Sequence, residues 1–151
     1  LKLRPEEIFE RPRDVRFHAS DILATADELL AHLSKTHDTT NGVHSGVIYD
    51  QENKKILVFR EDVGRHNVFD KLYGWALKNH VEITDKIIVF SGRCSSEMML
   101  KLGRMGIGAV AAKSVPTTLS LDVARKLGIT LCARMAPGSF CVYANPERIV
   151  L

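Results

Sequence analysis

The stretch ILVFREDVGRHNVFDK, residues 56–71, indicates the fold of this chain. Its apolar start, Ile56 to Phe59, is typical of a buried strand, and a helical pattern takes over at Gly64. A strand-to-helix turn points free backbone N–H groups and the positive end of a helix dipole outward, which favours a bound anion. The Arg-His-Asn triplet 65–67 falls in the first helical turn, beside that position. A merely solvated turn needs the glycine but not this triplet.

The rest of the chain continues this alternation of segments. We expect an extended arm over residues 1–17, and then a helix behind Ser20-Asp21 whose apolar residues recur at helical spacing. The segments expected after it are a hairpin of strands 43–49 and 55–59, a helix over 65–79, a strand over 86–90, a helix over 95–105, a strand over 108–112, a helix over 116–127, and closing strands over 129–134 and 140–143. This order predicts an α/β fold, a three-layer sandwich.

Composition narrows the class of protein. With 151 residues, 45% of them hydrophobic, the chain can bury one core, and without a linker or repeat we expect one domain, residues 1–151. A net charge of +3 is too small to indicate nucleic acid and suits an anionic small ligand. No apolar run approaches the roughly 20 residues of a membrane helix. Three cysteines without framework spacing favour a reducing, cytoplasmic location.

Three strand-to-helix junctions carry the candidate chemistry. They span residues 61–67, 91–97 and 113–118. Ligands of open α/β sheets bind at the carboxyl ends of the strands, so we expect the three junctions to converge on one edge. Each contains a basic residue that could neutralise phosphate, and hydroxyl groups stand at the expected helix starts of the last two. Serine, threonine and glycine are also what any helix N-cap needs, and this explanation is favoured for one junction alone. Three junctions at one edge favour a phosphate-bearing or nucleotide ligand.

Histidine and cysteine offer further chemistry. His66 could act as an acid, a base or a ligand contact, and His44 opens the hairpin expected nearby. Cys94 lies beside Arg93 at an expected helix start, where a thiolate would be stabilised, but a small packed residue is the favoured interpretation. Cys132 and Cys141 fall on expected core strands, and Met98, Met99 and Met105 are expected core filler. The sequence contains neither C-x-x-C nor H-E-x-x-H, so we expect no metal site.

Four motifs together resemble one known family. They are TNGVHSG (40–46), EDVGRHNVFDK (61–71), SGRCSSEMM (91–99) and AKSVPTTLSLDVARKLGITL (112–131), and they resemble the FdhD family of formate dehydrogenase accessory sulfurtransferases. The resemblance implies a cytidine deaminase-like fold without zinc. It also implies a dimeric cytosolic protein that takes sulfur from a cysteine desulfurase. The sulfur passes to the molybdenum cofactor, bis-molybdopterin guanine dinucleotide, before that cofactor enters formate dehydrogenase.

Two departures from the family pattern matter. The family's sulfur-carrying C-x-x-C loop lies upstream of the segment that matches Leu1 onward, and the chain does not begin with Met. We therefore expect a fragment or processed product that binds the cofactor, or GDP as its partial mimic, without transferring sulfur. The second departure is Asn41, where the family has a glycine, and it weakens any role for the turn around His44.

The resemblance implies three walls of a cofactor site. The residues carried over by position are Asp62, Arg65, His66, Asn67 and Lys71 for the first wall, Ser91, Gly92, Arg93, Ser95, Glu97 and Met98 for the second, and Lys113, Ser114, Thr117 and Thr118 for the third. Two alternatives stay open from the sequence. One is a stand-alone thiol enzyme that uses Cys94 with His66 as base, and the other is a non-catalytic scaffold that docks the desulfurase or the dehydrogenase.

Overall fold

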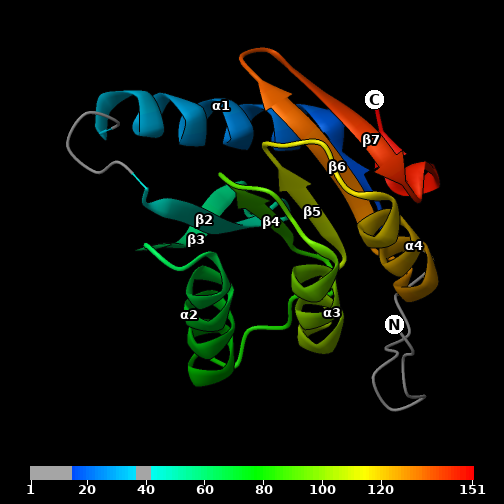
Figure 1. Ribbon diagram of the computed structural model, residues 1–151, viewed down its shortest axis with the longest axis horizontal. Helices are drawn as coiled ribbons and strands as arrows, with labels where there is room; N and C mark the ends of the chain where they lie inside the picture. The colour runs from blue at the N-terminus through cyan, green and yellow to red at the C-terminus, as the bar shows by residue number, and fades with distance from the viewer. Residues whose placement is uncertain (1–14, 37–41) are drawn as a thin grey trace.

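The computed structural model describes residues 15–36 and 42–151, and its centre is a six-stranded sheet of order β3-β2-β4-β5-β6-β7 (Figure 1). The strands are β2 (His44–Asp50), β3 (Lys55–Asp62), β4 (Ile87–Phe90), β5 (Ala109–Ala112), β6 (Thr130–Ala136) and β7 (Ser139–Ala144). β4 runs parallel to β5, and β5 runs parallel to β6. The other neighbouring strands are antiparallel, including the β2–β3 hairpin. The sheet is therefore mixed, with a parallel centre and antiparallel flanks.

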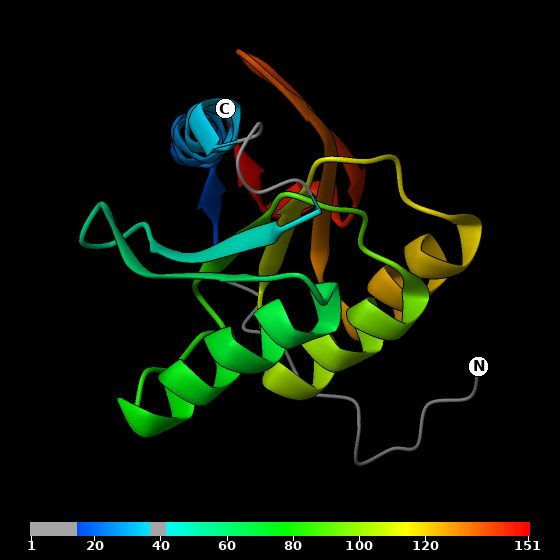
Figure 2. The same cartoon turned by 60° about the vertical axis from the view of Figure 1, so that its left-hand side comes forward.

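Helices cover both faces of this sheet. The helix α1 (Ala19–Thr36) lies across one face, and α2 (Arg65–Lys78), α3 (Ser96–Met105) and α4 (Thr118–Leu127) lie on the other (Figures 1 and 2). The predicted three-layer α/β sandwich is thus confirmed. The likeness to cytidine deaminases stays a prediction. None of the helices in residues 15–36 and 42–151 combines the length and apolarity needed to cross a bilayer.

The two faces of the sheet form two separate cores. On β4, Ile88 and Phe90 point into the core under α2, α3 and α4, where Phe90 packs against Phe69 with ring centroids 4.8 Å apart. Ile87 and Val89 point into the core under α1. Because a strand alternates its side chains between faces, the fully apolar run of β4 is what a strand covered on both sides requires.

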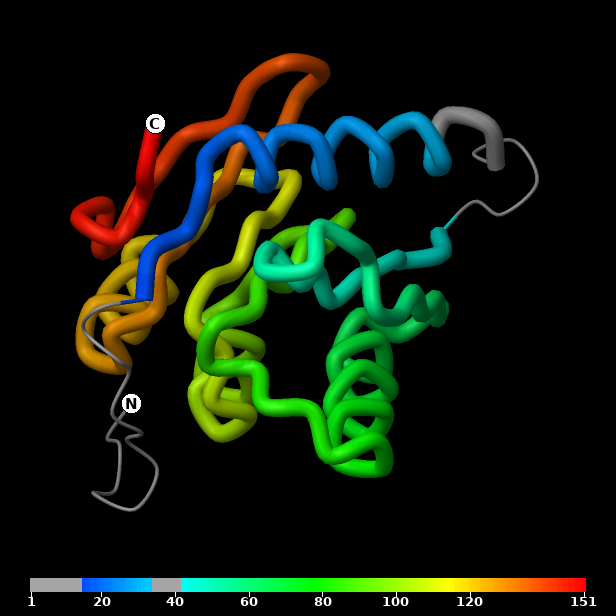
Figure 3. The backbone as a smooth tube through the Cα atoms, turned by 180° about the vertical axis from the view of Figure 1, so that it is seen from behind, coloured from blue at the N-terminus to red at the C-terminus, as the bar shows by residue number. Residues whose placement is uncertain are grey.

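A short second sheet ties the two ends of the described chain together. Phe17 of β1 (Phe17–His18) pairs in parallel with Ile149 of β8 (Ile149–Val150), and Figure 3 shows the two segments side by side. Phe17 is fully buried against the α1 face. The predicted arm over residues 1–17 is therefore wrong at its end, since Phe17 belongs to the core. Residues 1–14 of that arm lie outside the described residues.

Several predicted boundaries also shift. β3 continues to Asp62 rather than ending at Phe59, so Glu61 and Asp62 belong to the strand. α1 begins at Ala19, so Ser20 lies inside its first turn rather than capping it. α4 begins at Thr118 after its N-cap Thr117, and Pro116 precedes the cap. The prediction for Cys141 is wrong, because this residue is exposed on β7, while Cys132 is buried as predicted.

Candidate functional site

The three strand-to-helix junctions lie at one edge of the sheet. β3 and β4 both run antiparallel to β2, which lies between them, and β5 runs parallel to β4. The carboxyl ends of β3, β4 and β5 therefore share an edge, and α2, α3 and α4 begin there. The N-terminal ends of three helix dipoles thus meet at this edge, where they favour negative charge.

Direct contacts join the three junctions. The Ser91 N–H donates to the Ser45 carbonyl (2.9 Å), and the Ser91 Oγ accepts from the Ser45 N–H (2.8 Å), which continues the β2–β4 ladder into the second junction. The Lys113 N–H donates to the Gly92 carbonyl (3.3 Å), which joins the third junction to the second. His66 Nε2 lies 3.9 Å from Glu97 Oε2 and joins the first to the second. The predicted convergence is confirmed in geometry.

The first junction is held together by Asp62. This carboxylate accepts hydrogen bonds from the Gly64 N–H (2.8 Å) and the Asn67 side chain (3.2 Å) and pairs with the Lys71 ammonium (2.8 Å). The Lys71 contact above all, then the Gly64 and Asn67 bonds, lowers the pKa of Asp62 to about 2. Asp62, Asn67 and Lys71 therefore shape the junction by bonding one another. The carboxylate of Asp62 would repel an anion rather than bind it.

Two hydroxyl groups of the site serve as helix caps. Ser95 caps α3 by accepting a hydrogen bond from the Met98 N–H (3.3 Å), and Thr117 caps α4 by accepting one from the Ser120 N–H (3.1 Å). These bonds satisfy orphan N–H groups of the first helical turn. The capping explanation considered for a single junction therefore holds for these two side chains.

Three basic side chains at this edge, unlike the two capping hydroxyls, are not engaged with other side chains of the described residues. Arg65, Arg93 and Lys113 are exposed, and no side chain of residues 15–36 and 42–151 forms an ion pair with any of them. Each of the three junctions contributes one of these basic residues. Three uncompensated cations beside three helix N-termini form an arrangement suited to phosphate groups.

The other predicted site residues lie either at the exposed edge of the sheet or in the hydrophobic core. Gly92 lies beside His44, because a Cβ atom at Gly92 would stand 3.1 Å from His44 Nδ1 and 2.9 Å from the Phe90 ring. Glu97 and Thr118 are exposed and Ser114 is half-buried at the same edge. Met98 is fully buried in the core under α2, α3 and α4, in line with its prediction as core filler. Its side chain forms no part of the exposed edge.

Cys94 has the environment of a packing residue. It is buried, its Sγ lies 3.3 Å from the Met99 sulfur, and burial raises the pKa of its thiol to about 12. A nucleophilic cysteine needs an accessible thiolate. The geometry therefore disfavours the thiol-enzyme alternative with Cys94 and His66. In residues 15–36 and 42–151, no three His, Cys, Asp or Glu side chains are grouped to hold a metal ion.

Sequence reasoning missed a polar cluster on the α1 side of this edge. Glu61 Oε2 accepts a hydrogen bond from Ser45 Oγ (3.0 Å) and lies 3.7 Å from His32 Nε2 on α1. Ser45 is fully buried. The hairpin register, which sets Ser45 opposite Glu61, was the available signal, but the strand was expected to end at Phe59.

The fold and the edge together define an α/β protein with a candidate anion-binding site built from three strand-to-helix junctions. Comparison with known proteins identifies the family. A model of the FdhD/NarQ family matches residues 3–150, and the chain belongs to the FdhD/NarQ family.

Two curated relatives and one solved structure show the extent of the similarity. The chain is 48% identical over 116 residues to the sulfur carrier protein FdhD of Bacillus subtilis (strain 168), covering 77% of this chain and 44% of the relative. It is 40% identical over 121 residues to the sulfur carrier protein FdhD of Staphylococcus aureus (strain JH9), covering 80% and 45%. A crystal structure of a protein from Desulfotalea psychrophila, described as a formate dehydrogenase accessory protein, superposes with a TM-score of 0.82 at 32% identity. The superposition covers 97% of this chain and 63% of that one. The chain thus spans less than half the length of the two curated relatives.

Proposed function

We propose that this chain forms the cofactor-binding part of a sulfur carrier that serves formate dehydrogenase. Membership in the FdhD/NarQ family supports the sulfur-carrier role, as do the names of the two curated relatives. The solved relative, described as a formate dehydrogenase accessory protein, supports the choice of client enzyme. We place this function in the cytoplasm.

The cargo that we propose is the molybdenum cofactor in its bis-molybdopterin guanine dinucleotide form. The observation that carries this proposal is the set of exposed cations, Arg65, Arg93 and Lys113, at one edge beside three helix N-termini. A pyrophosphate group carries negative charge on two linked phosphates. Cationic side chains and the backbone N–H groups of helix N-termini both bind such charges. GDP contains the nucleotide end of this cargo and serves as its partial mimic.

We assign no sulfur-carrying step to Cys94 or Cys132. The 151 residues contain no C-x-x-C, and both Cys94 and Cys132 are buried with the pKa of each thiol raised to about 12. A thiol at that pKa remains protonated near neutral pH and is a poor acceptor of sulfur from a persulfide. In this proposal a cysteine desulfurase supplies the sulfur, and the residues of the candidate edge hold the cofactor in place.

Calorimetry with GDP tests the cofactor-binding role. We expect the wild-type chain to bind GDP, and Arg93→Ala to weaken binding by about 1.5–3 kcal/mol, the scale of a hydrogen bond to a charged group. Arg125→Ala is the matched control, because Arg125 lies in the last turn of α4, at the other end of that helix from the candidate edge. The absence of GDP binding at millimolar concentration would contradict the proposal.

One observation favours a docking role at the same edge. Val63 is 77% exposed, Val115 is 53% exposed and Leu119 is 45% exposed, and all three lie at or beside the junctions. Exposed apolar residues around a polar site are typical of a surface that meets another protein. Capture of formate dehydrogenase that survives the double change of Arg65 and Arg93 to alanine would favour docking without ligand.

We also propose that the chain forms a homodimer. Sedimentation equilibrium tests this oligomeric state.

A further inference from the structure

Exposed apolar side chains flank the basic residues of the candidate edge. Val63 lies in the turn between β3 and α2, Val115 lies in the turn between β5 and α4, and Leu119 follows in the first turn of α4. Because the strand order is β3-β2-β4-β5, these two turns stand at the two ends of the edge, with the β4–α3 junction between them. A partner that covers both apolar ends must therefore also cover the basic middle.

The basic middle opposes such a contact while it carries no anion. Arg65, Arg93 and Lys113 form no ion pair with a side chain of the described residues, and the N-termini of α2, α3 and α4 add positive charge. Removing an unpaired cation from water is strongly unfavourable unless an anion pairs with it. The apolar ends thus favour a contact that the unpaired cations oppose.

The acidic side chains of the junctions face other groups. Asp62 lies 2.8 Å from the Lys71 ammonium, and Glu97 lies 3.9 Å from His66 Nε2. Glu61 belongs to the polar cluster on the α1 side of the edge. Compensation of the three cations has to come from a bound anion or from the acidic surface of a partner. Phosphate groups suit this place best, because helix N-termini and cationic side chains both bind them.

We propose that the edge is a ligand-gated docking surface, which binds formate dehydrogenase tightly only when its anionic cargo is in place. The inference rests on the proposed function and adds a regulation of the same site. The bound anion neutralises the cations, and the apolar ends then bury against an apolar surface of the dehydrogenase. A carrier without cargo therefore leaves its client enzyme free. Docking through an acidic protein surface predicts the opposite sign, because the bound anion would then compete with the partner.

Surface plasmon resonance with the immobilised chain and cofactor-free formate dehydrogenase tests this coupling. We expect saturating GDP, and likewise inorganic pyrophosphate, to tighten docking about tenfold or more, within the usual range for coupled sites. The dehydrogenase should tighten GDP binding by the same factor in calorimetry, because coupling is reciprocal. The combined change of Arg65 and Arg93 to alanine should abolish the enhancement. An enhancement that persists in this double variant would come from ligand bound to the dehydrogenase and would overturn the proposal.

Substitutions at the apolar end beside α4 separate docking from ligand binding. The combined change Val115→Ser and Leu119→Ser should weaken docking of the GDP-loaded chain about tenfold or more, because two apolar side chains no longer bury. Its affinity for GDP without the dehydrogenase should equal that of wild type. Leu77→Ser is the matched control, since Leu77 is 59% exposed in the last turn of α2, at the other end of that helix from the edge. Leu77→Ser should change neither measurement.

The outcomes distinguish this inference from the function on which it rests. If GDP binds in calorimetry but leaves docking unchanged, or competes with the dehydrogenase, ligand-gated docking is wrong and the cofactor-binding role stands. The inference is also wrong if Leu77→Ser weakens docking as much as the changes at Val115 and Leu119. If the chain does not bind GDP at millimolar concentration, the proposed function fails and ligand-gated docking fails with it.

Discussion

The Asp62 carboxylate shows how one residue organises the candidate site. Its bonds to Lys71, Gly64 and Asn67 set the backbone of the β3–α2 junction, from which Arg65 extends into solvent. These bonds favour the charged form of the carboxyl and lower its pKa from 3.8 to about 2. Because the folded pKa lies below the unfolded one, the stabilisation from Asp62 is complete above about pH 4 and is lost as the pH falls through about 2.

Replacement of Asp62 by asparagine should therefore have a pH-dependent effect. We expect Asp62→Asn to lower the free energy of unfolding at pH 7, and the difference from wild type to narrow as the pH falls from about 4 to about 2. Urea denaturation at several pH values measures this difference. Asp122→Asn removes an exposed carboxylate on α4 and is the control. A difference that stays constant down to pH 2 would contradict the assigned role.

Cys94 gives a second test at the scale of one residue. Burial raises the pKa of its thiol to about 12, whereas Cys141 is exposed. We expect iodoacetamide at pH 8 to label Cys141 in the native protein, and Cys94 and Cys132 only after unfolding. Mass spectrometry of the labelled peptides measures this order. Rapid labelling of native Cys94 would restore the thiol-enzyme alternative.

Among the elements, α4 depends on its cap. The Thr117 hydroxyl accepts from the Ser120 N–H and donates to the Ser120 hydroxyl (3.1 Å each), so it is already engaged within the helix. We expect Thr117→Ala to destabilise the protein by about 1 kcal/mol, the usual cost of losing a threonine cap. For a chain of this size that corresponds to a fall of roughly 2–4 °C in Tm by calorimetry.

Binding measurements separate capping from ligand contact at Thr117. Thr117→Ser keeps the hydroxyl and should restore most of the stability. If Thr117 acts only as a cap, GDP affinity should stay within about twofold in both variants. A large loss of GDP affinity in Thr117→Ala with normal affinity in Thr117→Ser would show that the hydroxyl also contacts the ligand.

For the whole molecule, the candidate site predicts that ligand binding raises the thermal stability and that a high salt concentration reduces this effect. A ligand that binds only the folded state stabilises it by about 2.7 kcal/mol at 100 times its dissociation constant. GDP should therefore raise Tm. Because Arg65, Arg93 and Lys113 are exposed, raising the salt concentration from about 0.1 to about 1 M should reduce this effect, as the screening length falls from about 10 to about 3 Å. Thermal unfolding at both salt concentrations checks this, and an unchanged effect of GDP at high salt would argue against binding through these cations.

The sequence alone determined most of the layered fold, because the elements from β2 to β7 carry periodic apolar patterns that depend only on local spacing. It also placed the three junctions at one edge, since parallel strands with helical crossovers bring their carboxyl ends together. The cap residues Ser95 and Thr117 were recognisable as both caps and ligand candidates, because the same residue types serve both purposes.

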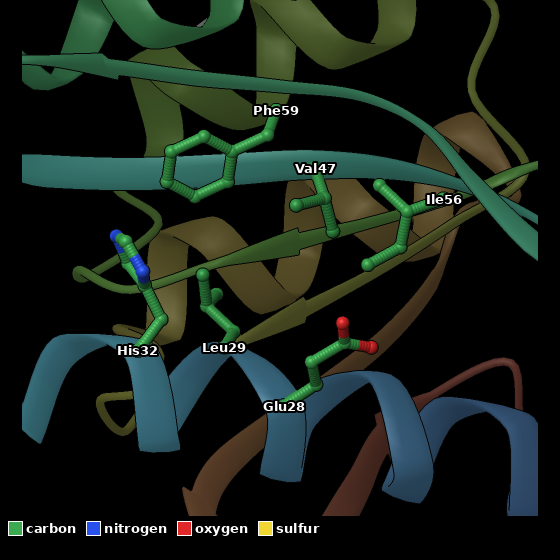
Figure 4. Close-up of a pocket in the computed structure, with 6 residues that line it drawn as sticks. All are labelled: Glu28, Leu29, His32, Val47, Ile56 and Phe59. Carbon is green, nitrogen blue, oxygen red and sulfur yellow. The ribbon is translucent and has the colours of Figure 1, made fainter. Parts of the chain in front are cut away.

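Tertiary structure decided the features that depend on contacts between distant segments. The pairing of Phe17 with Ile149 involves two-residue strands, whose formation depends on packing and not on a local pattern. The cluster of His32, Glu61 and Ser45 follows from the hairpin register and from the way α1 packs across it. A cavity of about 300 Å³ between α1 and the β2–β3 hairpin arises in the same way, because residues of α1, β2 and β3 form its walls together (Figure 4). A sequence pattern describes which face of an element is apolar, whereas the neighbour that each face meets is settled only when the layers pack.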